Sequence, residues 1–411
     1  MNVKQQRGLE MAAKFKILKK ADGTWSVPSQ TGKGHRYTIE MGDKPRCSCP
    51  YQETHDTKCK HVFAVEYFLQ REQHEDGSET VTETLTLTEK VSRKTYPQKW
   101  SSYNVAQITE KAEFQRLLYA LCQNINSSPQ INGRPRIPLS DAVFNVTFKV
   151  YSTISQRRFM SDLAEAHGKR YIGKIPHFNS ISNYLEKEEL TPILTDLIEE
   201  SSLPFSSIET EFAVDSTGFS STGYANWYAT KYGGIMDQRA WLKAHICCGV
   251  KTNVVTAVRV TDRTMNDCPL LPELVQKTAR NFEMLEVSGD KGYLSASNME
   301  AIVAVGGTPY LAFKRNNVAV HTGRRKHSDI WSQMFHRFSY EREDFLAHYH
   351  KRSNVESTFM AIKAKFGGSV RSKTFVAQTN EVLCKILCHN VCCVIQSMQE
   401  MGIDPGFGRT A

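Results

Sequence analysis

The chain has 411 residues, of which 40% are hydrophobic and 23% charged, and its formal net charge is +9 at pH 7. This length exceeds what one compact core usually holds, so we expect two or three domains. The positive charge permits an anionic partner without identifying it. No apolar run is long enough to span a membrane, and the first 20 residues lack the apolar core of a signal peptide. We therefore expect a reducing compartment, in which the 11 cysteines are thiols or metal ligands and not disulfides.

Residues 1–71 predict a small α+β domain with a cluster of soft metal ligands. "GTWSV" and "HRYTIEM" are typical of short strands, and "HVFAVEYFLQR" is typical of a helix. The spacing C-x-C-x9-C-x-H is formed by Cys47, Cys49, Cys59 and His61. Such ligands hold Zn²⁺ tetrahedrally in a closed structural site, which stabilises a domain with so small a core. His55, between the two pairs, is an alternative ligand.

This spacing, with a strand before the first pair and a helix after the last, resembles the SWIM zinc finger. The resemblance covers about residues 35–72. It implies one structural Zn²⁺ and binding to either DNA or protein. Four unliganded side chains are the alternative, which the tight pairing and the reducing context disfavour.

Residues 72–103 predict a linker. Between residues 72 and 89 there are six acids and no Lys or Arg, and threonines alternate in "TVTETLTLTEK". This run offers no face for a core, so a solvated acidic segment is the simplest interpretation.

Residues 104–204 predict a helical module. "AEFQRLLYALCQNI", "SDAVFNVTFKVYST" and "NSISNYLEKEEL" have apolar residues at helical spacing, and Ser140 or Asp141 is suited to cap the second helix. The basic residues between these helices are Arg134, Arg136, Arg157, Arg158, Lys169 and Arg170. They favour a helix-turn-helix-like DNA-binding module, with an all-helical spacer as the alternative.

From residue 205 the pattern changes to alternating strands and helices. "IETEFAVDS", "RAWLKAHICCGV" and "NVVTAVRVTD" predict three strands, the last two joined by a hairpin. "FEMLEVSGD" and "TPYLAFK" predict two more, with helices at "PLLPELVQKTAR" and "SASNMEAIVAVG". Helices at about 350–366 and 379–401 follow. This order predicts a mixed sheet flanked by helices.

The last of these helices carries a second group of cysteines. It consists of Cys384, Cys388 and Cys392 at four-residue spacing, with His389 and Cys393 nearby. Leucine, isoleucine and valine residues lie on the same side of the helix. We therefore expect small buried core residues there and assign no metal.

Glu356 is the single acid between Asp344 and Glu381, in a segment rich in Lys and Arg. On a helical wheel Tyr349, Arg352, Glu356 and Lys363 lie within about 60° of each other. They border an apolar stripe formed by Val355, Phe359, Ile362 and Phe366. The helix therefore packs on the sheet with Glu356 at the edge of that contact.

Two further acids, Asp215 and Asp290, end predicted strands. Two carboxylates from strands and one from a crossing helix make a hard oxygen site that suits Mg²⁺ or Mn²⁺. Two such ions about 4 Å apart activate a nucleophile and stabilise the leaving oxygen of a phosphodiester. Asp262 and Asp267 in "TDRTMNDC" compete with Asp290 as the second ligand.

The four residues from Tyr349 to Lys363 match every interval of the Y-(2)-R-(3)-E-(6)-K signature, and the chain resembles insertion-sequence DDE transposases. "AVDSTGF" and "SGDKGYLS" resemble that family's two Asp motifs, which implies Asp215 and Asp290 ahead of Asp262 and Asp267. The resemblance covers about residues 104–400.

This resemblance implies an α/β ribonuclease-H-like catalytic domain at residues 205–411, with an insertion at about 315–348. It implies two Mg²⁺ or Mn²⁺ ions at the three acids and DNA contacts by Tyr349, Arg352 and Lys363. Further candidate phosphate contacts in the insertion are Arg324, Arg325 and Lys326, with a solvated loop as the alternative.

The expected function is that of a DNA transposase, which binds element ends and catalyses strand cleavage and strand transfer. The family implies a homodimer in the synaptic complex and a cytoplasmic, nucleoid-associated location in a prokaryotic cell. A transposase-derived DNA-binding regulator without cleavage activity and a metal-dependent nuclease without strand transfer are the alternatives. The three acids disfavour the regulator, because DNA binding alone does not need carboxylates.

Overall fold

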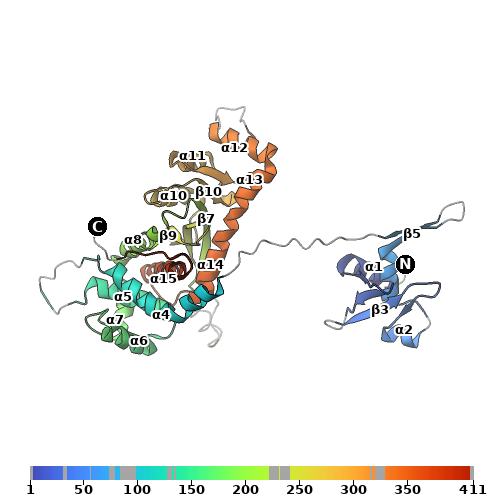
Figure 1. The fold of residues 1–411 in the computed structure, drawn as a ribbon, viewed down its shortest axis with the longest axis horizontal. Helices are drawn as coiled ribbons and strands as arrows, with labels where there is room; N and C mark the ends of the chain where they lie inside the picture. Colours follow the sequence, from blue (N-terminus) through green and yellow to red (C-terminus); the bar gives the residue numbers. More distant parts are fainter. Residues whose placement is uncertain are drawn as a thin grey trace. The chain divides into compact units, whose positions relative to one another are not determined.

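The computed structural model describes residues 3–30, 35–55, 57–73, 79–83, 99–126, 132–133, 136–221, 231, 241–314, 317–319 and 329–407. The chain forms two compact units, Met1–Tyr96 and Pro97–Ala411, and Figure 1 labels many of their elements. Each unit has its own buried core. They are therefore described one after the other.

The first unit packs helices on a small antiparallel sheet. The sheet order is β1-β2-β3-β4, with β1 at Leu18–Lys19, β2 at Trp25–Pro28, β3 at Arg36–Glu40 and β4 at Arg46–Cys47. The helices are α1 (Val3–Lys14), α2 (Pro50–Thr54) and α3 (Lys60–Phe68). A Cβ on Gly8 of α1 would lie 2.6 Å from the Phe63 Cβ. Glycine at this position therefore lets α1 approach α3 closely.

A two-stranded ribbon follows α3. Strand β5 (Leu69–Gln73) pairs antiparallel with β6 (Glu79–Glu83), so the start of the predicted linker is a β-ribbon. The alternation in "ETVTE" has the two-residue period of a strand. The linker prediction considered only that this run has no face for a core. Residues 84–98 lie outside the described part of the chain.

The second unit is built on a mixed five-stranded sheet of order β11-β10-β7-β8-β9. Its strands are β7 (Glu211–Ser220), β8 (Trp241–Gly249), β9 (Val255–Asp262), β10 (Glu286–Gly289) and β11 (Thr308–Leu311). Strands β10 and β11 run parallel to β7, whereas β8 and β9 form an antiparallel hairpin beside it. The predicted mixed sheet is confirmed. Strand β7 is longer than predicted, because its pairing with β8 continues past Asp215 to Ser220.

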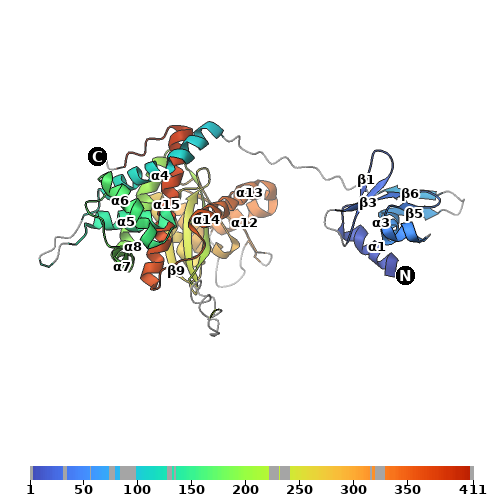
Figure 2. The ribbon, with the colours of Figure 1, turned by 90° about the horizontal axis from the view of Figure 1, so that it is seen from below.

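Helices surround this sheet (Figure 1). They are α4 (Trp100–Cys122), α5 (Leu139–Ser152), α6 (Gln156–Gly168), α7 (Phe178–Leu185), α8 (Leu190–Ser202), α10 (Leu271–Ala279), α11 (Ala296–Ala304), α12 (Asp329–Tyr340), α13 (Arg342–Tyr349), α14 (Ser353–Phe366) and α15 (Phe375–Met401). Short 3-10 turns are η1 (Leu203–Phe205), η2 (Cys268–Leu270), η3 (Lys291–Tyr293) and η4 (His350–Arg352). Figures 1 and 2 show α4–α8 gathered with α15 near β9. Helix α13 contacts β10 and β11 at the other edge of the sheet. Helices α4 to α8 thus share one core with the sheet, and their action as a DNA-binding module stays a prediction.

The start of α5 differs from the sequence-based prediction. Its N-cap is Pro138, and no side chain caps the helix. Asp141 instead accepts a hydrogen bond of 2.8 Å from the Gly173 amide and so links α5 to the α6–α7 connection. Burial raises the pKa of Asp141, while the Gly173 amide opposes that shift.

Helix α15 is the central helix of the second unit. Its length and composition would suit a membrane span, yet most of its residues are buried, which marks it as a core helix. It contacts α4, α5, α7, α8 and the sheet. Cys384 and Cys388 are fully buried, so their prediction as core residues is confirmed.

Two buried asparagines tie α15 to its neighbours. Asn390 donates from Nδ2 to the carbonyl oxygens of Ile198 and Val255 at 3.2 and 2.7 Å. Its Oδ1 accepts from the Val255 amide at 2.9 Å. Asn380 similarly donates to the carbonyl of Leu185 at 2.9 Å. These bonds fix α15 against α8, β9 and the α7–α8 connection, because buried polar groups are costly to leave unpaired.

Replacing Asn390 with alanine should therefore destabilise the second unit. Each buried backbone group left unpaired costs about 1–3 kcal/mol, and Val255 would lose partners for both its N–H and its C=O. We expect a clearly lower urea midpoint for Asn390→Ala. Gln396→Ala on the same helix is the control, because its side chain contacts Glu400 near the end of the helix. Equal midpoints for the two variants would contradict the role assigned to Asn390.

Candidate catalytic and metal sites

The register between β7 and β10 brings two acids side by side. The last residues that these parallel strands pair are Val214 and Gly289, and the next residues are Asp215 and Asp290. A Cβ on Gly289 would lie 2.9 Å from Leu311 Cδ2, so glycine permits the close packing of β10 on β11 at this point. The two acids thus lie at adjacent positions of neighbouring strands.

The helix that carries Glu356 begins later than predicted. Tyr349 is the last residue of α13, Arg352 is the last residue of η4, and Glu356 lies in the first turn of α14. The helical wheel assumed one continuous α-helix from Tyr349 onward, whereas the segment contains a 3-10 turn at His350–Arg352. The apolar stripe of α14 is buried as predicted, at Val355, Phe359, Ile362 and Phe366.

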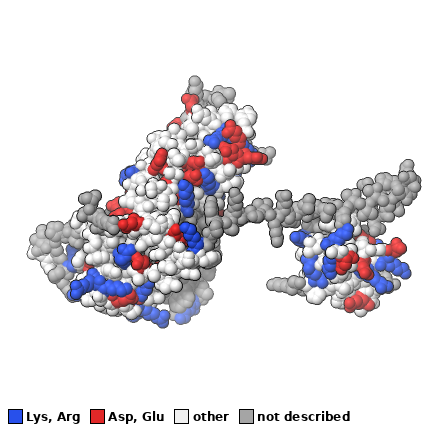
Figure 3. All heavy atoms as spheres, viewed as in Figure 1, with Lys and Arg blue, Asp and Glu red and all other residues white. Residues whose placement is uncertain are grey.

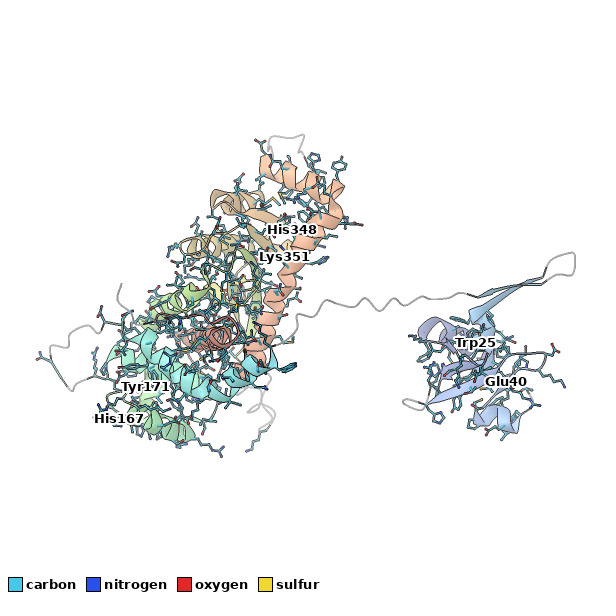
Figure 4. All side chains as sticks on the ribbon, in the orientation of Figure 1. Trp25, Glu40, His167, Tyr171, His348 and Lys351 are labelled. Carbon is cyan, nitrogen blue, oxygen red and sulfur yellow. The ribbon has the colours of Figure 1, made fainter. Side chains whose placement is uncertain are left out.

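An ion cluster holds η4 on the sheet. Lys351 Nζ lies 2.9 Å from Glu211 Oε2 and 2.8 Å from Glu286 Oε2. These acids are paired across β7 and β10, so they would repel each other without the lysine. His348 Nδ1 lies 2.8 Å from the Glu286 carboxylate, and Figure 4 shows His348 and Lys351 near each other. Burial alone would raise the pKa of Glu286, but Lys351 and His348 lower it.

Arg352 lies between two of the three candidate acids. Its Nη1 is 3.2 Å from Asp215 Oδ2 and 2.9 Å from Glu356 Oε1. Burial raises the pKa of Asp215, the Ser216 amide and Arg352 oppose this, and the charges of Asp290 and Glu356 raise it further. Asp290 and Glu356 thus both act electrostatically on Asp215, and the Arg352 guanidinium lies between Asp215 and Glu356.

Lys363 and two of the acids, Asp215 and Glu356, border one open cavity of about 580 Å³. Its lining residues are Asp215, Ser216, Thr217, Glu356, Phe359, Met360, Lys363 and Ala364. Lys363 Nζ donates to Thr217 Oγ1 at 2.6 Å, and burial lowers the pKa of the lysine. Asp290 and Tyr349 are not among the lining residues. We call this cavity the acidic groove.

The competing acids lie elsewhere. Ser216 follows Asp215 in β7, so its side chain points to the other face of the sheet. There Asp267 accepts from Ser216 Oγ at 3.0 Å and from Lys243 Nζ at 2.6 Å. Asp262 ends β9 and accepts from the Thr264 amide. Neither acid lines the acidic groove.

The surroundings of Asp267 were missed by sequence reasoning. His245 Nδ1 lies 3.3 Å from Asp267 Oδ1, and burial lowers the pKa of His245 to about 4. His245 is also the register partner of Ser216. The available signal was "KAH" in β8, because Lys243 and His245 are two residues apart and so share one face of the sheet.

The predicted basic contacts are only partly visible. Arg134, Arg324, Arg325 and Lys326 lie outside the described residues. Lys169, at the end of α6, pairs with Glu165 at 2.6 Å. Arg157, Arg158 and Arg170 are exposed.

The Cys–His cluster of the first unit converges tightly. The ligand atoms of Cys47, Cys49, Cys59 and His61 lie within 4.8 Å of one another, and all four side chains are buried. Cys59 is the N-cap of α3 and His61 lies in its first turn, so the second pair of the spacing is followed by a helix as expected, while Cys49 is the N-cap of α2. His55 stacks on Tyr51 with 4.5 Å between the ring centroids and is not in the cluster. Within the described ranges, the carboxylates of the acidic groove form no group this tight.

The donor set of this cluster suits Zn²⁺. His61 Nδ1 lies 3.9 Å from Cys47 Sγ and 3.7 Å from Cys59 Sγ, so Nδ1 is the nitrogen that faces the sulfurs. A hydrogen bond with the Cys47 thiol lowers the pKa of Cys59 to about 4, against the effect of burial, and His61 acts in the same direction. The same bond and burial raise the pKa of Cys47. Three buried sulfurs, one readily deprotonated, and one imidazole form a set that could bind zinc.

Comparison with protein families supports the interpretation of the second unit. Residues 206–391 match the model of the family described as Transposase DDE domain. The match contains Asp215, Asp290 and Glu356, and it supports a DDE transposase. It implies a ribonuclease-H-like fold, which the mixed sheet and its flanking helices fit. Comparisons with curated proteins and with solved structures gave no match.

The first unit lies outside the matched residues. Its resemblance to the SWIM zinc finger therefore stays a prediction. The observation that supports a zinc site there is the buried Cys–His cluster itself.

Cys59→Ser should remove zinc from the purified full-length protein. The wild-type chain should contain about one zinc ion, because four ligands close a structural site, and the variant should contain almost none. Elemental analysis measures the zinc content. His55→Ala is the matched control and should keep its zinc. A variant at Cys59 with full zinc content would show that the ligands are wrong.

Lys351→Met should lower stability by about 1–3 kcal/mol, because it leaves Glu211 and Glu286 facing each other without a cation. Chemical denaturation of the full chain measures this loss. Lys187→Met is the control, since Lys187 pairs with Glu189 at the surface and should change stability by less than about 0.5 kcal/mol. A loss no larger than that of the control would rule out the anchoring role.

Proposed function

We propose that this protein is a DNA transposase that binds the ends of a mobile element and catalyses metal-dependent strand cleavage and strand transfer. The observation that carries the proposal is the position of Asp215 relative to the other two acids. Asp215 and Asp290 follow the last paired residues of two parallel strands, and Arg352 links Asp215 to Glu356. The family match supports a transposase in general terms.

Asp215, Asp290 and Glu356 would hold the metal ions. Carboxylate oxygens are the donors that Mg²⁺ and Mn²⁺ prefer, and a cation, the Arg352 guanidinium, is already stabilised between two of these acids. Two such ions supply activation of the attacking hydroxyl or water and stabilisation of the leaving oxygen. The pairing of β7 with β10 holds the backbone next to Asp215 and Asp290 in place, which suits both residues as metal ligands.

The cations beside the acids would bind the DNA backbone. With the carboxylates bound to metal, the Arg352 guanidinium would be free to bind a phosphate in bidentate geometry. Tyr349 accompanies it, with its ring centroid 5.9 Å from the guanidinium carbon. Lys363 lies in the acidic groove and would contact a neighbouring phosphate. These roles agree with the signature that Tyr349, Arg352 and Lys363 share with insertion-sequence transposases.

Other parts of the chain would recognise DNA and assemble the complex. Helices α4 to α8, the first unit with its zinc, and the basic residues Arg324, Arg325 and Lys326 are candidates for end recognition. Joining two element ends would require a homodimer in the synaptic complex. A protein of this function would act in the cytoplasm of a prokaryotic cell, in contact with the nucleoid.

The proposal is tested with Glu356→Ala. Strand cleavage of an end-containing duplex in Mg²⁺ should fall by about three orders of magnitude or more, since a metal ligand is lost. Binding of the same duplex should change little. Glu343→Ala on α13 is the control, because Glu343 does not line the acidic groove. Cleavage by Glu356→Ala at the wild-type rate would falsify the assignment.

The same assay separates the two alternatives. A nuclease without strand transfer would nick the duplex but would not join the freed 3′ end to a second DNA. A regulator derived from a transposase would bind the ends, and even the wild-type chain would not cut them.

A further inference from the structure

A second cavity, of about 420 Å³, lies between the helical segment and the connection from α14 to α15. Its walls include Lys149 of α5, Ser155 before α6, Arg371 of the connection, and Glu381 and Lys385 of α15. It shares no lining residue with the acidic groove. We call it the junction cavity.

Three cations face the junction cavity. Lys385 is 2% exposed and donates to the carbonyl oxygens of Phe366, Gly367 and Ser369 at 2.9, 2.8 and 2.7 Å. Arg371 donates from Nη1 to the Thr153 carbonyl at 3.1 Å. For Lys149 Nζ, the described residues provide no hydrogen bond or ion pair. Two of the charges are therefore fixed by backbone oxygens, while the third has no partner in the described part of the chain.

Glu381, the single acid among the residues that line this cavity, accepts its hydrogen bonds from groups other than Lys149. Both carboxylate oxygens of Glu381 accept from the Arg371 amide at 3.0 Å. The Ser372 amide and hydroxyl also donate to Glu381, at 2.9 and 2.7 Å. The acid is thus used to hold the connection, and three positive charges share the cavity with one negative charge.

The lowered pKa of Lys149 and the N-terminus of α6 also favour a bound anion. Burial and the charge of Arg371 lower the pKa of Lys149 to about 8, although the charge of Glu381 acts in the opposite direction. A bound anion would offset both. Helix α6 begins at the cavity, and its N-cap Ser155 makes no side-chain capping bond. The partial positive charge of that helix end attracts anions as well.

The junction cavity lies along the same elements as the acidic groove. Phe366, in its wall, ends α14, so it lies ten residues and about 15 Å of helix from Glu356. The connection also pairs with the end of β7, where the Ser220 amide donates to the Gly368 carbonyl at 3.0 Å. At about 3.4 Å per nucleotide along a duplex axis, this separation is about four or five nucleotides.

We propose that the junction cavity is a phosphate-binding site that takes one backbone phosphate of the DNA bound in the acidic groove. The inference rests on the proposed function, since it requires DNA in that groove. Arg157 and Arg158 at the start of α6 are exposed, and Figure 3 shows Lys and Arg gathered at the lower edge of the larger unit, where Figure 1 places α6 and α7. They would extend the positive path along the same strand of DNA.

The test measures DNA binding by Lys149→Gln and Arg371→Gln in full-length protein that also carries Glu356→Ala. The probe is a labelled duplex of about 20 base pairs in a series of salt concentrations. The plot of log Kobs against log salt has a negative slope. Each substitution should make this slope less steep by about 0.9, the value for one lost phosphate contact. Lys373→Gln is the matched control, because Lys373 is exposed in the same connection but does not line the cavity. Its slope should stay unchanged.

Inorganic phosphate distinguishes a free anion from a DNA phosphate. Phosphate should raise the unfolding temperature of the wild-type chain more than that of Lys149→Gln. If phosphate acts through Lys149 while the DNA slope is the same in all variants, the cavity binds a free anion and the DNA assignment is wrong. Equal slopes together with no phosphate effect would overturn the site altogether. Unfolding temperatures without phosphate verify that each variant is folded.

These measurements do not depend on cleavage. If the wild-type chain fails to cut DNA but Lys149 still sets the salt slope, the proposed transposition chemistry fails and the phosphate site stands. If cleavage depends on Glu356 but the slope does not depend on Lys149, the transposase proposal stands and the phosphate site fails.

Discussion

The parallel pairing of β7 with β10 is the constraint on which the candidate catalytic site depends. It ends at Val214 and Gly289, so the next residue on each strand is an aspartate. A shift of one residue would turn one of these carboxylates to the opposite face of the sheet, where Asp267 binds Lys243. The hairpin of β8 and β9 and the close packing at Gly289 leave β7 and β10 little freedom to shift.

A short 3-10 turn connects this sheet to the third acid. Lys351 and Arg352 are consecutive in η4, and they contact acids at two heights of β7, Glu211 and Asp215. Residues 211 and 215 are separated by an even number, so both side chains lie on the face that η4 crosses. The turn therefore sets where α14 begins and with it the position of Glu356. The ion pairs that balance the charge of these acids therefore also determine where the helix lies.

Helix α15 makes the helical segment and the sheet a single unit. Its buried asparagines bind α8 and β9, and Lys385 binds the connection that follows α14. The junction cavity exists because these elements meet. Lys149, which has no partner among the residues that the structure describes, lies on α5, far in sequence from Arg371. This attachment would help a protein whose DNA contacts both the helices α4 to α8 and the acids on the sheet, because it fixes the two sets of contacts relative to each other.

The sequence by itself determined the features that depend on local spacing. These include the Cys–His cluster, the buried stripe of α14 and the core cysteines of α15. They also include two acids, Asp215 within β7 and Asp290 directly after β10. Only the tertiary structure decided that Arg352 lies between Asp215 and Glu356, that Asp267 faces the other side of the sheet, and that Lys149 and Arg371 share a cavity. The periods of helices and strands depend on neighbouring residues, whereas strand register and packing bring together residues that are far apart in the sequence.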